Sequence, residues 1–334
     1  MKAIGYTTPG DVDVLQWLDL PDPTVEPRDI LVRVEAVSIN PADTGMRRSK
    51  SGDSGKPVVL GYDAVGTVVR GGREATLFKE GDRVFYAGSM SRDGSDAELQ
   101  AVDERIVGRA PTSISMTDAA ALPLTALTAW EMLFDRMHVP YGPKLVEGTL
   151  LIINGAGGVG SILTQLARRL TGLTVVATAS RPETIAWCEK MGAHHVIDHH
   201  KPLDEALKHV GIGQAEYVAG LTKTAAHADA LQKLIAPQGV IALIDDAIDI
   251  EPFKTKAVTI AWELMFTRSY YGTKDIARQG QILNEVASLV DAGLITSTAT
   301  MTLGALTPDT LREGHELSES GKMIGKIVLP GIDG

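Results

Sequence analysis

The residues with the clearest chemical meaning form a glycine-rich run in the middle of the chain. Gly155-Ala156-Gly157-Gly158-Val159-Gly160 fits the pattern G-x-G-x-x-G. It follows the apolar run Leu150–Asn154 and leads into a helical pattern at Val159–Leu170. Between a strand and a helix, such glycines let backbone N–H groups approach a pyrophosphate at the N-terminus of the helix. The run predicts a dinucleotide site, and a glycine turn without a ligand is the alternative.

The end of the next strand distinguishes the two nicotinamide cofactors. An NAD site carries Asp or Glu about 20 residues after the glycines, where it binds the ribose 2′-hydroxyl. Here Ala179-Ser180-Arg181 holds that place and offers no carboxylate. A hydroxyl and a guanidinium suit a 2′-phosphate, so we expect NADPH. The alternative makes Ser180 the N-cap of the next helix, with Arg181 in solvent and Pro182 in the first turn. Both interpretations can hold together.

Strands and helices alternate around these residues, which is typical of a parallel, doubly wound sheet. The expected strands are Leu150–Asn154, Thr174–Ala179, His195–Ile197, Glu216–Ala219 and Val240–Ile244. The expected helices are Val159–Leu170, Pro182–Met191, Leu203–Val210 and Ala225–Ile235. An apolar segment follows Lys256.

The two ends of the chain indicate a β-rich domain instead. Ile30–Val37 alternates apolar and charged residues, the period of a half-buried strand. Ser115 is the expected N-cap of an Ala- and Leu-rich helical stretch that reaches Phe134. Further strands are expected at Ala64–Val69, Arg83–Tyr86, Ala97–Val102, Thr298–Leu303 and Lys326–Leu329, with a helix at Asp275–Ala292. We infer that the C-terminus returns to the N-terminal β domain.

Composition narrows the function classes. The 334 residues suggest about two domains, and the net charge of −10 disfavours nucleic acid or an anionic membrane as a partner. The single cysteine, Cys188, excludes an internal disulfide and a multi-cysteine zinc cluster, and it is expected to be a buried packing residue. The N-terminal segment lacks the apolar core of a signal peptide, and no apolar run approaches the ~20 residues of a membrane span. These features favour a cytoplasmic protein.

Several motifs together carry a family resemblance. They are Ser38-Ile-Asn-Pro-Ala-Asp-Thr, Gly61-Tyr-Asp-Ala-Val-Gly, Leu122-Pro-Leu-Thr-Ala-Leu-Thr-Ala-Trp, the glycine run and Phe266-Thr-Arg-Ser. The chain resembles the medium-chain dehydrogenase/reductase superfamily, and within it the zinc-free quinone oxidoreductase branch, which includes zinc-type alcohol dehydrogenase-like proteins. The resemblance implies a Rossmann NADP-binding domain at 123–267, inserted in a GroES-like β-barrel domain formed by 1–122 plus 268–334. It also implies an active site between the domains, and a homodimer formed edge to edge through the nucleotide-domain sheet.

The resemblance further implies roles for individual residues. Asn40 takes the place of a zinc cysteine and faces the nicotinamide in zinc-free relatives. Tyr62 takes the position at which zinc alcohol dehydrogenases have a histidine ligand, and Asp63 that of the acidic residue next to it. Leu124 lies near the position of the third zinc ligand. Cofactor contacts are implied for Thr128 near the nicotinamide, for His199 near the 2′-phosphate and for Lys326 in the C-terminal strand. Gly45 stands where several quinone reductases have a tyrosine, which weakens any tyrosine proton donor from this loop. Arg47 either stabilises negative charge or is solvated.

The donor set argues against zinc. A catalytic zinc needs three ligands from Cys, His, Asp or Glu, and Asn40, Tyr62 and Leu124 do not supply them. A short strand is bracketed by His194, His195, His199 and His200, for which solvated loop positions are favoured over a metal site. Without a Lewis acid, alcohol oxidation lacks a route to the alkoxide. A quinone, a conjugated enone or a conjugated aldehyde accepts hydride more readily, because hydrogen-bond donors can stabilise the developing oxyanion. The candidate donors are Asn40, Tyr62 and Arg47.

The sequence therefore predicts an NADPH-dependent, quinone reductase-like oxidoreductase that acts on a small electrophilic substrate without a metal. The alternatives are a zinc-type alcohol dehydrogenase, a non-catalytic NADPH-binding protein and a reductase for one specific enone. The substrate itself does not follow from the sequence. Phe266, Tyr270 and Tyr271 either form a flat wall for a planar acceptor or pack in the core or at a subunit interface.

Overall fold

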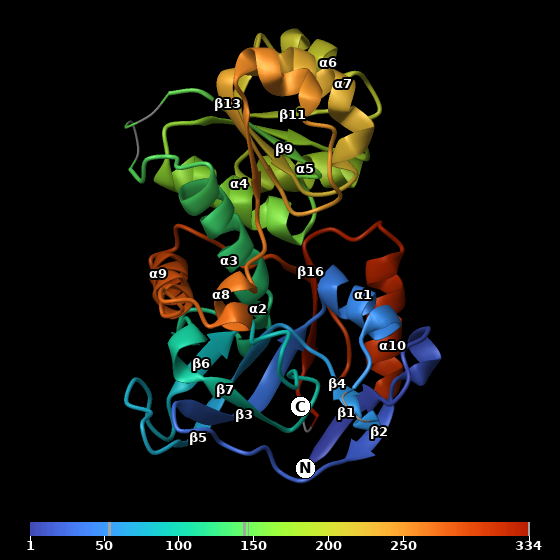
Figure 1. Ribbon diagram of the computed structural model, residues 1–334, viewed down its shortest axis with the longest axis vertical. Coiled ribbons are helices and arrows are strands. Elements are labelled where there is room, and N and C mark those ends of the chain that lie inside the picture. The colour runs from blue at the N-terminus through green and yellow to red at the C-terminus, as the bar shows by residue number, and fades with distance from the viewer. Residues whose placement is uncertain (53–54, 143–144, 146, 333–334) are drawn as a thin grey trace. The chain divides into compact units, whose positions relative to one another are not determined.

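The chain forms two compact units in the computed structural model, which describes residues 1–52, 55–142, 145 and 147–332 (Figure 1). Unit 1 comprises Met1–Leu127 and Phe266–Gly334, and unit 2 comprises Thr128–Met265. The boundaries thus fall at 127/128 and 265/266, where the sequence predicted 122/123 and 267/268. Unit 2 is one continuous segment, so unit 1 is built from both ends of the chain.

Unit 1 contains two sheets. The larger has the strand order β15-β16-β3-β5-β6-β8, with β7 also paired to β3, and the smaller has the order β2-β1-β4. The C-terminal strand β16 runs antiparallel to β3, with Val328 opposite Ser38. The predicted return of the C-terminus to the N-terminal β domain is therefore confirmed. The strands are β1 (Lys2–Tyr6), β2 (Gln16–Asp19), β3 (Asp29–Ser38), β4 (Val58–Val59), β5 (Ala64–Gly71), β6 (Arg83–Tyr86), β7 (Leu99–Asp103), β8 (Gly108–Arg109), β15 (Ala299–Thr302) and β16 (Lys326–Pro330).

The helices of unit 1 begin where the sequence carries start signals. Ser115 is the N-cap of α2, and its hydroxyl accepts the Asp118 N–H at 3.0 Å. The stretch is not one continuous helix, because Pro123 cannot donate a backbone hydrogen bond and stands at the first position of α3. The helices of this part of the chain are α1 (Pro41–Ser49), α2 (Met116–Ala120), α3 (Pro123–Trp130), α8 (Thr267–Tyr271), α9 (Arg278–Asp291) and α10 (Pro308–Glu319).

Unit 2 is a parallel sheet with the strand order β11-β10-β9-β12-β13-β14. In chain order within the unit this is 3-2-1-4-5-6, the order of a doubly wound dinucleotide fold. Its strands are β9 (Thr149–Ile153), β10 (Thr174–Thr178), β11 (His195–Ile197), β12 (Ala215–Gly220), β13 (Ile235–Leu243) and β14 (Thr259–Trp262). Its helices are α4 (Gly158–Leu170), α5 (Pro182–Met191), α6 (Leu203–His209) and α7 (Ala228–Leu234). The apolar segment after Lys256 thus contains the sixth strand, which the sequence pattern left unassigned.

Side chains of the unit 2 strands point alternately to the two faces of the sheet. Leu151, Ile153 and Val176 pack with residues of α6 and α7 in one buried cluster. Ala177 packs with Cys188 of α5 in another, and α4 lies on the other side of the sheet from α6 and α7 (Figure 1). Burial raises the pKa of the Cys188 thiol to about 12, as suits a packing residue. No helix in the described ranges is long and apolar enough to cross a membrane.

Candidate functional site

The glycine turn of unit 2 is attached to the neighbouring strand by backbone groups. Asn154 follows β9 in a left-handed conformation, with φ of 67°. Its N–H donates to Thr178 Oγ1 at 2.9 Å, and the Gly155 N–H donates to the Thr178 carbonyl at 3.1 Å. The turn is therefore held against the end of β10, beside the residues that were predicted to contact the ribose.

Two glycines of this turn are required by close packing. A Cβ on Gly155 would lie 2.6 Å from the Cβ of Ala177, and one on Gly160 would lie 2.4 Å from the Asn154 carbonyl oxygen. Gly157 is the N-cap of α4, so the first-turn N–H groups after it have no intrahelical acceptor. Such groups at the positive end of a helix attract phosphate. A turn without side chains, joined to a free helix N-terminus, fits the pyrophosphate of a dinucleotide.

The end of β10 differs from the expectation in one detail. Arg181, not Ser180, is the N-cap of α5, and Pro182 is the first helical residue. The cap lies one residue later because the Arg181 N–H donates to Thr184 Oγ1 at 3.1 Å, within the first turn. The Arg181 guanidinium is 3.2 Å from Glu183 Oε1, and both side chains are about half exposed. Exposed ion pairs of this kind are worth little, so this contact does not prevent the guanidinium from binding a phosphate.

His199 lies near two other histidines and Lys223. Its ring centroid is 4.6 Å from that of His200. Burial lowers the pKa of His199, and the neighbouring charges of His200, His227 and Lys223 lower it further, against the opposite effect of Asp198. Sequence reasoning identified His199 but not its association with Lys223 and His227, which come from a later part of unit 2. Thr128, on α3, is buried.

Unit 1 contains a buried polar network at the ends of three strands. Asp63 precedes β5, Lys326 begins β16, and Asn40 follows β3. The Lys326 ammonium donates to the Ile39 carbonyl at 2.7 Å, to Asp63 Oδ2 at 3.1 Å and to Asn40 Oδ1. The Asn40 amide donates to the same Asp63 oxygen at 2.8 Å. Asp63 also accepts hydrogen bonds from the Ser38 hydroxyl and, at 2.7 Å, from the Leu124 N–H. These residues together are called the Lys326 network.

The hydrogen bonds of the Lys326 network occupy the donors and acceptors of its side chains. Both ends of the Asn40 amide are engaged, so its orientation is fixed. The three N–H bonds of Lys326 all have acceptors within unit 1, and the cofactor contact that the resemblance implies for it stays a prediction. Burial lowers the pKa of Lys326 and raises that of Asp63, while the attraction between the two charges opposes both shifts. Each ion is therefore maintained by its partner.

Asp43 is hydrogen-bonded to the backbone of Asn40 and was not among the predicted site residues. Its carboxylate accepts the Asn40 N–H at 2.7 Å and the Gly61 N–H at 3.2 Å. Burial raises the pKa of Asp43 to about 7, although these hydrogen bonds and the Lys326 charge act in the opposite direction. Asn40 is the N-cap of α1, and Asp43 follows it by three residues, which is the spacing of a capping box. This spacing could have identified Asp43 from the sequence.

Tyr62 is buried, and its hydroxyl donates to Met46 Sδ at 2.8 Å. Its ring meets that of Phe266 edge to face, with centroids 5.1 Å apart. Burial, followed by the repulsion of Asp43, raises the pKa of Tyr62, which therefore stays protonated at neutral pH. Phe266 is a core residue, whereas Tyr270 and Tyr271 are exposed and stack edge to face against each other.

Arg47 is fully buried, so the solvated alternative for this residue is wrong. Its guanidinium donates to the Gly10 carbonyl at 3.1 Å and to Glu319 Oε1 at 2.7 Å, and it lies 2.9 Å from His315 Nδ1. These contacts connect α1 with α10. The charge of Arg47 is compensated by Glu319, which makes the residue a structural connection between two helices.

Comparison with known proteins agrees with this division. Residues 26–115 match the family model of the alcohol dehydrogenase GroES-like domain, and residues 158–285 match that of the zinc-binding dehydrogenases. A zinc-type alcohol dehydrogenase-like protein of Staphylococcus aureus is 41% identical over 336 residues, covering 98% of this chain and 99% of the relative. The chain belongs to the medium-chain dehydrogenase/reductase superfamily. Unit 1 is its GroES-like domain and unit 2 its Rossmann domain.

Two further members of the superfamily are similar. A solved zinc-dependent alcohol dehydrogenase protein of Rhizobium etli is 50% identical, with a TM-score of 0.95 and coverage of 99% of this chain and 98% of that one. A chloroplastic NADPH-dependent alkenal/one oxidoreductase of Arabidopsis thaliana is 34% identical over 254 residues, covering 72% of this chain and 64% of that protein.

The zinc that some of these names imply does not fit the residues of this dehydrogenase/reductase. Asn40 and Asp63 bind the Lys326 ammonium, the Tyr62 hydroxyl faces Met46, and Leu124 has an apolar side chain. A buried ammonium at this position would repel a divalent cation. Across the described residues, no three Cys, His, Asp or Glu side chains could together hold a metal. Of the four histidines around β11, His194 already accepts the Val175 N–H through Nδ1 at 2.9 Å.

Proposed function

We propose that this protein is an NADPH-dependent oxidoreductase that delivers hydride to an electrophilic carbonyl compound without a metal. The acceptor would be a quinone, a conjugated enone or a conjugated aldehyde. The observation that carries the proposal is the Lys326 network, because it places an ammonium among the residues at which dehydrogenases of this superfamily bind zinc. An acceptor of this kind needs little polarisation, since conjugation spreads the charge that hydride brings.

Residues of unit 2 would hold the cofactor. The backbone of Gly155–Gly160 would bind the pyrophosphate, and Ser180, Arg181 and His199 would surround the 2′-phosphate, with Thr128 near the nicotinamide. NADPH supplies a hydride when it is bound. The missing carboxylate after β10 favours NADPH over NADH, because a 2′-phosphate next to Asp or Glu would be repelled. The name of the Arabidopsis relative is consistent with this cofactor and with an enone substrate.

Tyr62 is the best placed of the three predicted donors. The Asn40 amide is engaged at both ends, and Arg47 is bound to Glu319 and His315. The Tyr62 hydroxyl donates only to a thioether sulfur, which is a weak acceptor, so exchanging Met46 for a substrate oxygen costs little. We assign Tyr62 the stabilisation of the developing oxyanion. The Lys326 network would keep neighbouring charges fixed during that step.

Steady-state kinetics test this proposal. NADPH oxidation is expected with 1,4-benzoquinone or trans-2-hexenal, in buffer with chelator and without added zinc, and no ethanol oxidation is expected. Arg181→Ala should lower kcat/KM for NADPH about tenfold or more and leave the NADH value unchanged, since one charged hydrogen-bonded contact is worth roughly 1.5–3 kcal/mol. Arg169→Ala, an exposed arginine near the C-terminal end of α4, is the matched control. Activity that requires stoichiometric zinc would contradict the proposal.

We also propose that the protein forms a homodimer through β14. This strand ends the sheet of unit 2, and in the described part of the chain no further strand pairs with its outer side. Trp262 is 55% exposed there and Leu264 is 49% exposed. An apolar edge strand is a template for pairing with a second copy. Trp262→Arg should shift the mass measured by light scattering from dimer to monomer. Leu294→Arg, at an apolar residue of unit 1 that is 45% exposed, should leave it unchanged.

A further inference from the structure

Asp43 is hydrogen-bonded to two backbone segments of unit 1 that carry predicted donors. One oxygen of its carboxylate accepts the N–H of Asn40 at 2.7 Å. The other oxygen accepts the N–H of Gly61, the residue before Tyr62, at 3.2 Å. Asp43 is 2% exposed, so no water competes for these two bonds. A single carboxylate therefore connects the start of α1 with the segment that carries Tyr62.

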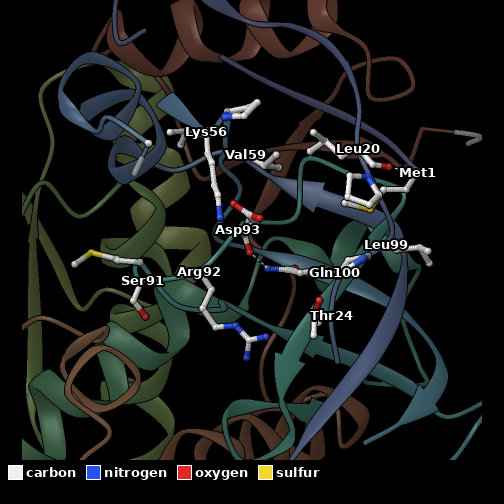
Figure 2. Close-up of a pocket in the computed structure, with 18 of the residues that line it drawn as sticks. Met1, Leu20, Thr24, Lys56, Val59, Ser91, Arg92, Asp93, Leu99 and Gln100 are labelled. Atoms are coloured by element: carbon white, nitrogen blue, oxygen red, sulfur yellow. Dashed lines mark hydrogen bonds between the residues drawn. The ribbon is translucent and has the colours of Figure 1, made fainter. Parts of the chain in front are cut away.

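The Gly61 segment needs this connection because it is held by few other groups. Gly61 has a φ of 110°, and a Cβ there would lie 2.4 Å from Ser95 Oγ. The Ser95 N–H donates to the Gly61 carbonyl at 3.1 Å, which joins two neighbouring loop segments. Immediately before these residues, the same two segments line a pocket of about 970 Å³, at Val59 and Asp93 (Figure 2). The segments thus border open space, and the bond to Asp43 ties Gly61 to α1.

Charged and titratable groups from several elements surround the Asp43 carboxylate. Burial raises the pKa of Asp43 to about 7, against the attraction of Lys326 in β16 and with a smaller repulsion from Asp63, which precedes β5. Burial, followed by the Asp43 charge, raises the pKa of Tyr62 and of Asp96, which is 3% exposed. Both of these groups stay protonated at neutral pH. Asp43 is therefore the member of this group whose charge changes near neutral pH.

We propose that Asp43 is a positioning residue for the reaction proposed above, on which this inference rests. Its ionised carboxylate holds the Tyr62 segment in register with Asn40, so that the Tyr62 hydroxyl meets the developing oxyanion. A protonated carboxyl has a donor in place of one acceptor, so it accepts only one of the two N–H groups well. It keeps the shorter bond, to Asn40 within its own helical turn, and releases Gly61. Hydride transfer then slows.

The pH dependence of kcat tests this role with saturating NADPH and trans-2-hexenal. In the parent, kcat should rise by up to about tenfold between pH 6 and 8, as expected for a required group with a pKa of about 7. Asp43→Asn has the same shape but does not ionise. Its kcat should stay near the low-pH value of the parent at every pH, and its KM for NADPH should equal that of the parent at the same pH.

Asp118→Asn is the matched control. Asp118 stands at the third position of α2, after the N-cap Ser115, as Asp43 does in α1. This variant should keep the pH profile of the parent. The same loss of kcat in both variants would assign the effect to helix capping and overturn the proposal. A kcat of the active parent that does not change between pH 6 and 8 would also overturn it, as would a parent-like profile in Asp43→Asn.

NMR of the full chain measures the two hydrogen bonds without turnover. The amide protons of Asn40 and Gly61 should shift with pH at one common midpoint, because both donate to the same carboxylate. Neither should titrate in Asp43→Asn. Amide protons that do not titrate in an active parent overturn the positioning role alone. A parent that oxidises no NADPH overturns the proposed function and the positioning role with it, whereas a common midpoint would still establish the two bonds to Asp43.

Discussion

Replacement of Lys326 by methionine is the sharpest test of the buried network. The substitution keeps an unbranched side chain of similar length and removes the ammonium. Asp63, whose side chain is fully buried, would keep the bonds from Ser38, Asn40 and the Leu124 N–H but lose the ammonium with which it forms an ion pair. Removing one member of a buried ion pair typically costs about 3–5 kcal/mol, because the remaining charge stays uncompensated. We expect Lys326→Met to destabilise unit 1 by that amount.

The size of the effect follows from the unit's length. Unit 1 has 127 residues before the insertion and 69 after it, 196 in all. A domain of this size loses about 2–4 °C of melting temperature for each kcal/mol, so the expected decrease is roughly 6–20 °C. Scanning calorimetry is suitable because the two units can unfold in separate transitions. Lys79→Met, at an exposed lysine, should remain within about 0.5 kcal/mol of the parent.

A second substitution distinguishes ion pairing from simple packing. Asp63→Asn in the Lys326→Met background removes the uncompensated carboxylate, so the double variant should be more stable than the sum of the two single effects predicts, by about 2 kcal/mol or more. If Lys326→Met costs less than about 1 kcal/mol, or if the two effects simply add, the ion pair does not hold this site together. The Lys326 ammonium would then be no obstacle to a divalent cation at this position.

Three further predictions concern the cofactor turn and pH. Gly160→Ala places a Cβ 2.4 Å from the Asn154 carbonyl, so it should cost about 1–3 kcal/mol in urea unfolding and weaken NADPH binding measured by fluorescence. Burial and the Arg47 charge lower the pKa of His315 to about 3, so the folded state binds fewer protons than the unfolded state between about pH 3 and 6.5. The contribution of His315 to stability should therefore fall by roughly 3 kcal/mol from pH 7 to 4, and the difference in stability between the parent and His315→Asn should change by that amount; a constant difference would refute the assignment. The pKa of Asp43 is raised to about 7, so its contribution has the opposite sign. As pH rises from about 4 to 7, ionisation of the buried Asp43 should lower the stability of the parent by up to roughly 4 kcal/mol. Asp43→Asn lacks this ionisation, so its stability relative to the parent should increase over the same pH range.

Most of unit 2 could be predicted because its signals are local. The glycine run and the missing carboxylate lie at the ends of consecutive strands, and each strand and helix of the alternation shows its own short hydrophobic pattern. The sixth strand could not be assigned, because Thr259–Trp262 at the sheet edge is only partly buried and shows no long apolar run. The helix cap was placed one residue early because the choice between Ser180 and Arg181 depends on a hydrogen bond within the first turn.

Unit 1 was harder to predict because its site joins distant segments. Asn40 and Lys326 are 286 residues apart, and Arg47 and His315 are 268 apart. The motif around Asn40 could be identified in the sequence. No sequence pattern indicates that the Lys326 ammonium, from the C-terminal strand, lies next to the Asn40 side chain.

The sequence by itself determined the glycine turn between β9 and α4, the lack of zinc-ligand residue types at Asn40, Tyr62 and Leu124, and the return of the C-terminus to the β domain. These follow from residue type and from periods of a few residues. Only the tertiary structure decided which polar groups are buried together. It made Lys326 the partner of Asp63 and bound Arg47 to α10. The physical reason is that the energy of a charge or an amide depends on what surrounds it, and those surroundings come from strands that meet only in the folded chain.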